Sequence, residues 1–94
     1  MFSQGLWKLD MGGRAAIVDD LISSDILKAK QQKAVVTLLG TPIRTYDENK
    51  LIKMAYYTGF RSKPFSIDPG FLIVEIKNGQ VGRYYLKEGV PYLN

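Results

Sequence analysis

The stretch Phe71–Leu86, FLIVEIKNGQVGRYYL, constrains the fold more than any other part of the chain. Two runs rich in β-branched and aromatic residues flank Asn78-Gly79. Asn-Gly between such runs is the strongest short-range signal for a hairpin with a two-residue turn. The sequence therefore predicts an antiparallel hairpin near the C-terminus.

A two-residue turn also sets the register of this hairpin, because it places Lys77 opposite Gln80. Side chains then alternate between the two faces of the sheet. The pairs predicted on one face are Ile76 with Val81, Val74 with Arg83 and Leu72 with Tyr85. The pairs predicted on the other face are Glu75 with Gly82, Ile73 with Tyr84 and Phe71 with Leu86. Both faces are thus predicted to carry apolar side chains.

Helical patterns precede the strands. Apolar residues recur at helical spacing from Arg14, and SSD at Ser23–Asp25 predicts a break, because these side chains compete for backbone hydrogen bonds. A second helix is predicted over Gln32–Leu39. One bent helix from Arg14 to Leu39 is the alternative.

Gly40, in VVTLLGTP, is predicted to end the second helix and not to bind a ligand. A glycine that cradles phosphate normally precedes a helix, whereas Gly40 follows one. It has no partner glycines at fingerprint spacing and no Gly-Lys-Ser/Thr. A positive φ at Gly40, with Pro42 preventing continuation, fits the C-terminal cap of a helix.

A third strand is predicted over residues 51–60, LIKMAYYTGF, from its two-residue alternation. Residues 41–50 and 61–70 are predicted as loops, with turns at Asp47–Asn49 and Asp68–Gly70. The predicted fold class is α+β, with two N-terminal helices packed on a three-stranded antiparallel β-meander, in the order ααβββ. Residues 1–13 are predicted to form a flexible N-terminal segment whose Trp7 docks on the body of a single domain, 14–94.

The composition argues against most catalytic chemistry. The chain of 94 residues has no cysteine and no histidine, so it lacks the usual nucleophile, general base and transition-metal ligand. We predict no enzymatic activity, no catalytic residues, no cofactor and no metal. The net charge of +4 comes from dispersed lysines and arginines, so binding of nucleic acid is disfavoured. No segment reaches the length of a transmembrane helix, and the first residues do not read as a signal peptide.

Two short helices cover only one face of a three-stranded sheet. The other face would then expose a larger apolar patch than monomers usually tolerate. The face that carries Phe71, Ile73, Tyr84 and Leu86 is predicted to be the uncovered one. We expect it to bind a protein partner, a second copy of the chain or the N-terminal segment.

The stretch DILKAKQQKAVVTLLGTP resembles the second-helix signature of the SmpA/OmlA, or BamE-like, domain family. The matching positions are Val35, Leu38, Leu39, Gly40 and Pro42. YYTGF, FSIDPGFLIVEI and the Asn-Gly hairpin resemble the later strands of the same family, so the resemblance covers roughly residues 14–86. The chain departs from the family pattern at Ala29, where the family has glycine, and at Gln31, where it has a Ser or Thr cap.

The resemblance implies a BLIP-like fold and a non-enzymatic accessory domain of the bacterial cell envelope, similar to outer-membrane assembly lipoprotein domains. Such a domain would work through protein contacts in the periplasm, where the resemblance also allows a position close to a membrane. Two alternatives stay open from the residues themselves: a cytoplasmic location, and a module that binds nucleic acid or an anionic surface with its dispersed Lys/Arg and the sheet tyrosines.

Overall fold

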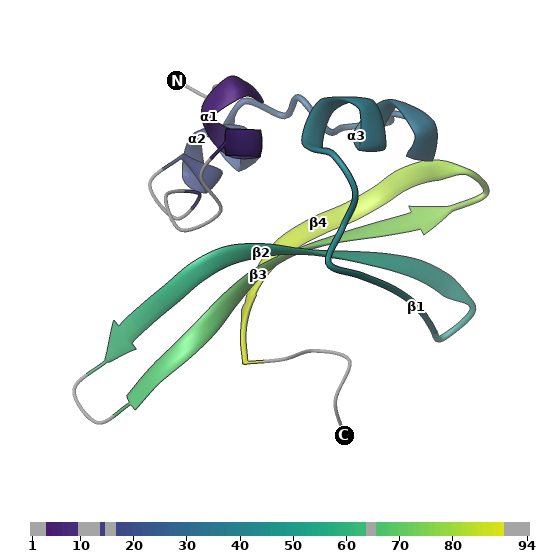
Figure 1. The fold of residues 1–94 in the computed structure, drawn as a ribbon. Helices are drawn as coiled ribbons and strands as arrows, with labels where there is room; N and C mark the ends of the chain where they lie inside the picture. The colour runs from purple at the N-terminus through teal and green to yellow at the C-terminus, as the bar shows by residue number, and fades with distance from the viewer. Residues whose placement is uncertain (1–3, 10–13, 15–16, 64–65, 90–94) are drawn as a thin grey trace.

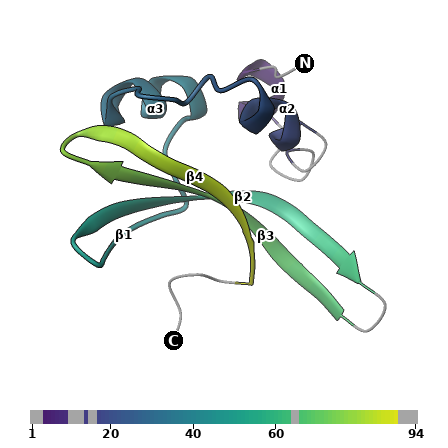
Figure 2. The same ribbon diagram turned by 180° about the vertical axis from the view of Figure 1, so that it is seen from behind.

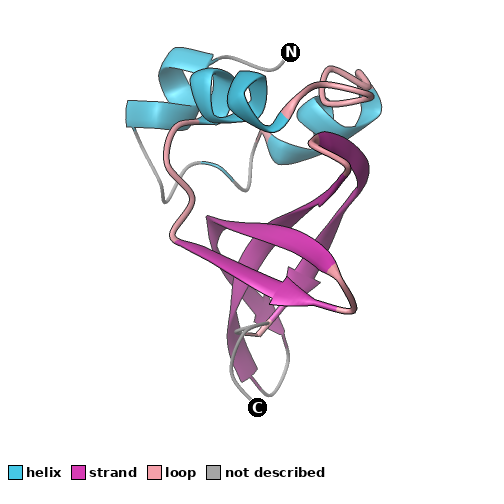
Figure 3. Ribbon diagram, turned by 90° about the vertical axis from the view of Figure 1, so that its right-hand side faces the viewer, coloured by secondary structure: helices cyan, strands magenta, loops and turns pink. Residues whose placement is uncertain are grey.

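In a computed structural model, residues 4–9, 14, 17–63 and 66–89 are described. Helices form one layer and a four-stranded antiparallel sheet forms the other (Figures 1 and 3). The elements are α1 (Gln4–Leu9), α2 (Val18–Ser23), α3 (Gln32–Leu39), β1 (Arg44–Glu48), β2 (Leu51–Lys63), β3 (Ser66–Lys77) and β4 (Gln80–Glu88). The α+β class predicted from the sequence is confirmed.

The sheet has the order β1-β2-β3-β4, so the prediction of three strands is wrong by one. The additional strand, β1, lies in the segment expected to be a loop. Its turn to β2 is Asn49-Lys50, both with positive φ, and not Asp47–Asn49. β1 is exposed or half-buried along its length and therefore lacks the apolar alternation by which strands are recognised.

The β2–β3 hairpin is longer than predicted. The pairs Gly59 with Gly70 and Phe60 with Pro69 continue the ladder through the predicted turn at Asp68–Gly70. On its other side, β3 is held by β4, where the Gly89 N–H donates a hydrogen bond to the Pro69 carbonyl oxygen at 2.8 Å. Pairing on both sides outweighs the turn preference of Asp-Pro-Gly, so this prediction is wrong.

The helix predicted over Gln32–Leu39 is α3, with the predicted limits. The helix predicted from Arg14 is shorter in the structure, since α2 begins at Val18, and the chain turns after Ser23 as expected. Part of the segment 1–13, predicted to be flexible, forms helix α1, and residues 1–3 and 10–13 lie outside the described residues. The predicted docking of Trp7 is confirmed, since its side chain is 0% exposed.

One apolar cluster fills the space between the helices and the sheet. It joins buried side chains from all three helices and from β2, β3 and β4. Its largest members are Trp7, Tyr56, Leu21, Leu27, Leu39, Met54 and Leu72. The helices cover one face of the sheet only, as Figure 2 shows from behind.

The C-terminal end of α3 is capped by side chains of α1. Three donors on α1 reach α3 carbonyl oxygens, each at 3.0 Å: Trp7 Nε1 to Leu39, and Gln4 Nε2 and Lys8 Nζ to Thr37. The last carbonyls of a helix have no partner within it, so these bonds satisfy groups that would otherwise be orphaned. This explains why a six-residue helix, too short to be stable alone, is formed here.

Gly40 ends α3 as predicted, but its conformation is not the left-handed helical one. Its φ is 87° and its ψ is −169°, a region that essentially only glycine occupies. Its N–H donates to the Val36 carbonyl oxygen at 2.8 Å, and its own carbonyl oxygen accepts a hydrogen bond from the Tyr56 hydroxyl at 2.8 Å. Gly40 therefore joins the end of α3 to the sheet.

Candidate interaction surface

A bulge in β4 changes the predicted site. The pairs Lys77 with Gln80 and Ile76 with Val81 are as expected, and Asn78 and Gly79 both have positive φ. Beyond them the register shifts by one residue, because Gly82 is left without a partner and Glu75 pairs with Arg83.

The bulge separates the four predicted binding residues. Phe71 and Ile73 lie on the face away from the helices, which we call the outer face. Tyr84 and Leu86 instead pack against the main cluster, on the helix-covered face. Tyr85 takes the place opposite Ile73. The prediction that the four residues share one face is wrong, because alternation reverses after an unpaired residue.

The apolar part of the outer face is also not exposed. Phe71 is 3% and Ile73 0% exposed, and with Ala55 they form a second, smaller buried cluster. Half-buried tyrosines pack against this cluster from three strands: Tyr46, Tyr57 and Tyr85. The expectation of a large bare apolar face is therefore wrong for the described residues, and a binding role for Phe71 or Ile73 stays a prediction.

A charged group lies beside the second cluster, centred on Lys53 of β2. Its Nζ atom is 2.7 Å from Glu48 Oε1 and 3.4 Å from Glu75 Oε2, and it donates a hydrogen bond to the Tyr85 hydroxyl at 3.3 Å. Both Lys53 and Glu75 are buried. Arg83 extends the group, with Nε 3.5 Å from Glu75 Oε1 and its guanidinium 5.0 Å from the centre of the Tyr85 ring.

These contacts shift the titration of the group. The hydrogen bond to Glu48 raises the pKa of Lys53 well above its usual range, against the opposing effect of burial. The same hydrogen bond lowers the pKa of Glu48. Both residues are thus held charged at neutral pH, as an ion pair between a buried lysine and a partly exposed glutamate.

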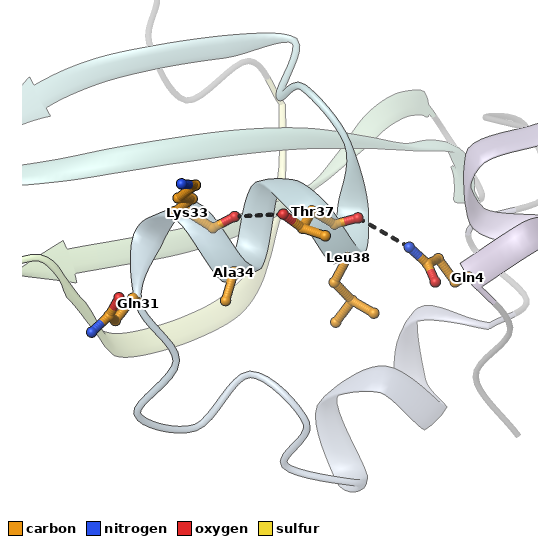
Figure 4. Close-up of a pocket in the computed structure, with 6 residues that line it drawn as sticks. All are labelled: Gln4, Gln31, Lys33, Ala34, Thr37 and Leu38. Atoms are coloured by element: carbon orange, nitrogen blue, oxygen red, sulfur yellow. Dashed lines mark hydrogen bonds between the residues drawn. The ribbon is translucent and has the colours of Figure 1, made fainter.

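The α3 surface holds a shallow hollow of about 440 Å³, shown in Figure 4. Its apolar lining comes from Ala34 and Leu38, and its polar lining from Gln4, Gln31, Lys33 and Thr37. The Gln4 side chain is already engaged with the Thr37 carbonyl oxygen. The hollow offers no convergent pair of charged groups that would select a small ligand.

Edge strand β1 is the other candidate, and it was missed by sequence reasoning. In the described part of the chain it pairs with β2 alone. Three large apolar side chains are exposed among the described residues: Val36 (37%) on α3, Ile43 (51%) just before β1, and Ile52 (36%) on β2, the strand that pairs with β1. We call these three residues the β1 flank.

Members of the flank lie close to residues that contact β2. Gln32 Nε2, at the start of α3, is 3.9 Å from Met54 Sδ, and the Tyr56 hydroxyl bonds to the carbonyl of Gly40, so both ends of α3 contact β2. Val36 follows Gln32 by four residues and lies on the same side of the helix. Ile52 precedes Met54 by two residues on the same face of the sheet, and the Ile43 N–H donates to the Ala55 carbonyl at 2.9 Å.

The opposite edge of the sheet is better protected. The Val81 N–H of β4 donates to the Lys30 carbonyl oxygen at 2.8 Å, and the Gln32 N–H donates to that of Gly79 at 2.9 Å. The chain before α3 therefore covers the start of β4. Covering an edge in this way prevents pairing with another chain at that point, so the start of β4 is protected.

Comparison of the chain with known protein families, with curated proteins and with solved structures gives no match. Among the described residues there is no group of three or more acidic side chains that could hold a metal ion. None of the described helices is long and apolar enough to span a membrane.

Proposed function

We propose that this chain is a non-enzymatic protein-interaction domain of the BamE-like type, working as an accessory domain in the bacterial cell envelope. Its support is the order of elements, helices followed by an antiparallel sheet, with LLGTP at the end of α3 and Asn-Gly at the last hairpin. Strand β1 is an addition to the ααβββ order that the resemblance implies.

The observation that carries the proposal is the β1 edge together with its flank. An edge strand presents unpaired backbone N–H and C=O groups to any extended segment that approaches it. Exposed apolar residues near the edge, Ile43 and Ile52, can contact alternate side chains of that segment. The partner that fits is therefore a protein segment in extended conformation, which adds to the sheet as a fifth strand.

Site-specific photocrosslinking in the native cells tests this proposal. A photoreactive residue replaces Ile43 or Ile52, and a control replaces the exposed Lys87 at the far end of β4. We expect crosslinks to one protein from the two flank positions and none to that protein from the control. Equal crosslinking from all three positions, or none from the flank, would refute the assignment of the surface.

A second experiment measures the affinity of purified variants for the crosslinked protein. The Ile52→Asp variant should bind the crosslinked protein about tenfold or more weakly, because loss of one buried isoleucine contact costs about 1.5–3 kcal/mol. Lys87→Asp is the matched control and should bind as the unchanged chain does. Unchanged affinity of Ile52→Asp would contradict the proposal.

A second candidate is binding of nucleic acid or an anionic surface by the outer face. The structure places Tyr85 beside Arg83 there, and Lys87 is exposed two residues further along β4. Against it, the guanidinium of Arg83 and the ammonium of Lys53 already contact the Tyr85 ring, at 5.0 and 5.9 Å from its centre. Phosphate binding at this face would weaken steeply with added salt, which a titration of single-stranded DNA at several salt concentrations tests directly.

A further inference from the structure

We propose that β1 is a self-complementary edge that pairs antiparallel with β1 of a second copy of this chain, across a two-fold axis at Tyr46. The inference rests on the proposed function, since it names the partner of the same surface. Two four-stranded sheets would then join into one continuous sheet, with the β1 strands at its centre.

The direction of the backbone groups in β1 follows from its turn. Asn49 and Lys50, with φ values of 55° and 66°, form a two-residue turn, which makes Glu48 and Leu51 a hydrogen-bonded pair. Hydrogen-bonded and non-hydrogen-bonded pairs alternate along an antiparallel ladder. Thr45 and Asp47 are therefore in non-hydrogen-bonded pairs, and their N–H and C=O groups point away from β2.

The outward groups allow only some registers with a second copy. Thr45 and Asp47 must meet outward groups of the other strand, so the two-fold axis lies at Thr45, Tyr46 or Asp47. With the axis at Tyr46, Thr45 of each copy meets Asp47 of the other, and all four residues make backbone hydrogen bonds. This register engages every outward group of the five-residue strand.

The charges of β1 select the same register. With the axis at Tyr46, Arg44 of each copy lies directly opposite Glu48 of the other, so two pairs of opposite charges form. An axis at Asp47 would place two carboxylates directly opposite each other, which is unfavourable. An axis at Thr45 leaves Glu48 without the opposing arginine.

Glu48 can contact Arg44 of the second copy in addition to Lys53 of its own chain. Only its Oε1 atom is bonded to Lys53, and its side chain is 49% exposed. The exposed carboxylate thus has an oxygen left for an arginine of the other copy. β1 contains no proline and no lysine. Its charged residues would deter pairing with an unmatched strand, but in this register Arg44 and Glu48 meet opposite charges.

Sedimentation velocity with charge-reversed variants tests the proposal. The unchanged chain should show a dimer whose population rises with concentration. Arg44→Glu alone places glutamates opposite each other, and Glu48→Arg alone places arginines opposite each other, so each variant should lose the dimer. An equimolar mixture of the two variants should regain it, since both cross-strand pairs are again of opposite charge.

A backbone variant tests whether loss of the dimer could be caused by loss of folding. Thr45→Pro removes an outward N–H and leaves the inward ones that bind β2, so it should lose the dimer and keep the circular dichroism spectrum of the unchanged chain. A monomer at all concentrations up to millimolar, a dimer insensitive to both charge reversals, or a mixture that stays monomeric would each overturn the proposal. If photocrosslinks from Ile43 and Ile52 then reach a different protein, the proposed function stands without this inference.

Discussion

The two faces of the sheet bury their side chains in different ways. On the helix-covered face, three helices supply a continuous apolar cluster that contains Trp7, the largest side chain of the core. On the outer face, three apolar residues are buried among tyrosine rings and beside the Lys53–Glu75 ion pair. One face is stabilised mainly by the removal of apolar area from water, and the other depends on matched charges.

A small chain can avoid a bare apolar face without a second layer of helices. The described helices all lie on the other face of the sheet, and a bare patch on the outer face would favour association. Long side chains with polar ends, tyrosine and lysine, cover apolar neighbours with their stems and rings and keep their polar atoms bonded. The hydroxyl of Tyr85 and the ammonium of Lys53 do so here.

The largest expected effect is on the helix-covered face. Trp7→Ala should lower the free energy of unfolding by about 3–5 kcal/mol, because it removes a fully buried indole and its hydrogen bond to Leu39. Urea denaturation measures the loss. Trp7→Phe, which keeps an aromatic ring, should lose less, and equal losses for the two variants would argue against packing as the main contribution.

The corresponding change on the outer face is Lys53→Met. It leaves Glu75 buried and without its lysine, and should cost about 3 kcal/mol. The double variant Lys53→Met/Glu75→Leu should recover most of this stability, since an apolar pair of similar volume replaces the ion pair. A double variant as unstable as Lys53→Met would show that the ion pair is not what Lys53 contributes.

A smaller effect is expected where α3 meets the sheet. Gly40→Ala should cost about 1–3 kcal/mol, because its φ and ψ lie in a region that is strained for any side chain. Gly82→Ala is the matched control: the added Cβ would come no closer than 3.8 Å to another atom, so it should cost less. Thermal unfolding compares the change in Tm of the two variants, and equal changes would contradict the assignment of strain to Gly40.

The smallest effect concerns Glu48, whose pKa the hydrogen bond to Lys53 lowers. A carboxyl whose pKa is lower in the folded state stabilises the fold above its unfolded pKa of about 4.3. That contribution is lost as the pH falls through the lower folded value. The free energy of unfolding, measured in urea between about pH 6 and pH 2, should decrease less steeply with falling pH for Glu48→Gln than for the unchanged chain. Identical slopes for the two proteins would contradict this prediction.

Sequence reasoning succeeded where local patterns decide the structure. Helix α3 and the Asn78-Gly79 turn follow from helical spacing, a terminal glycine and a dipeptide suited to positive φ. It failed at α1 and β1, which lack a strong pattern of their own. Six residues make a helix in α1 only because Gln4, Trp7 and Lys8 bond to the end of α3.

The candidate site was misjudged at a single residue. Gly82 within a strand is a known sign of a bulge, and this signal was available in the sequence. Without the bulge, Tyr84 would share a face with Ile73; with it, Tyr84 lies over the helix-covered cluster and donates a hydrogen bond to Asp25. One unpaired residue thus exchanges the two faces of β4 and removes two of the four predicted binding residues from the outer face.

The fold class, the limits of α3, the last hairpin and the absence of histidine and cysteine chemistry can be predicted from the sequence, since these depend on residue types and local spacing. Which side chains share a face, and where the edges of the sheet are covered, becomes clear only in the folded chain. Both depend on contacts between distant segments, as when the Lys30 carbonyl covers the start of edge strand β4. Such contacts depend on hydrogen bonds between strands, which the pattern of residues along a single strand does not specify.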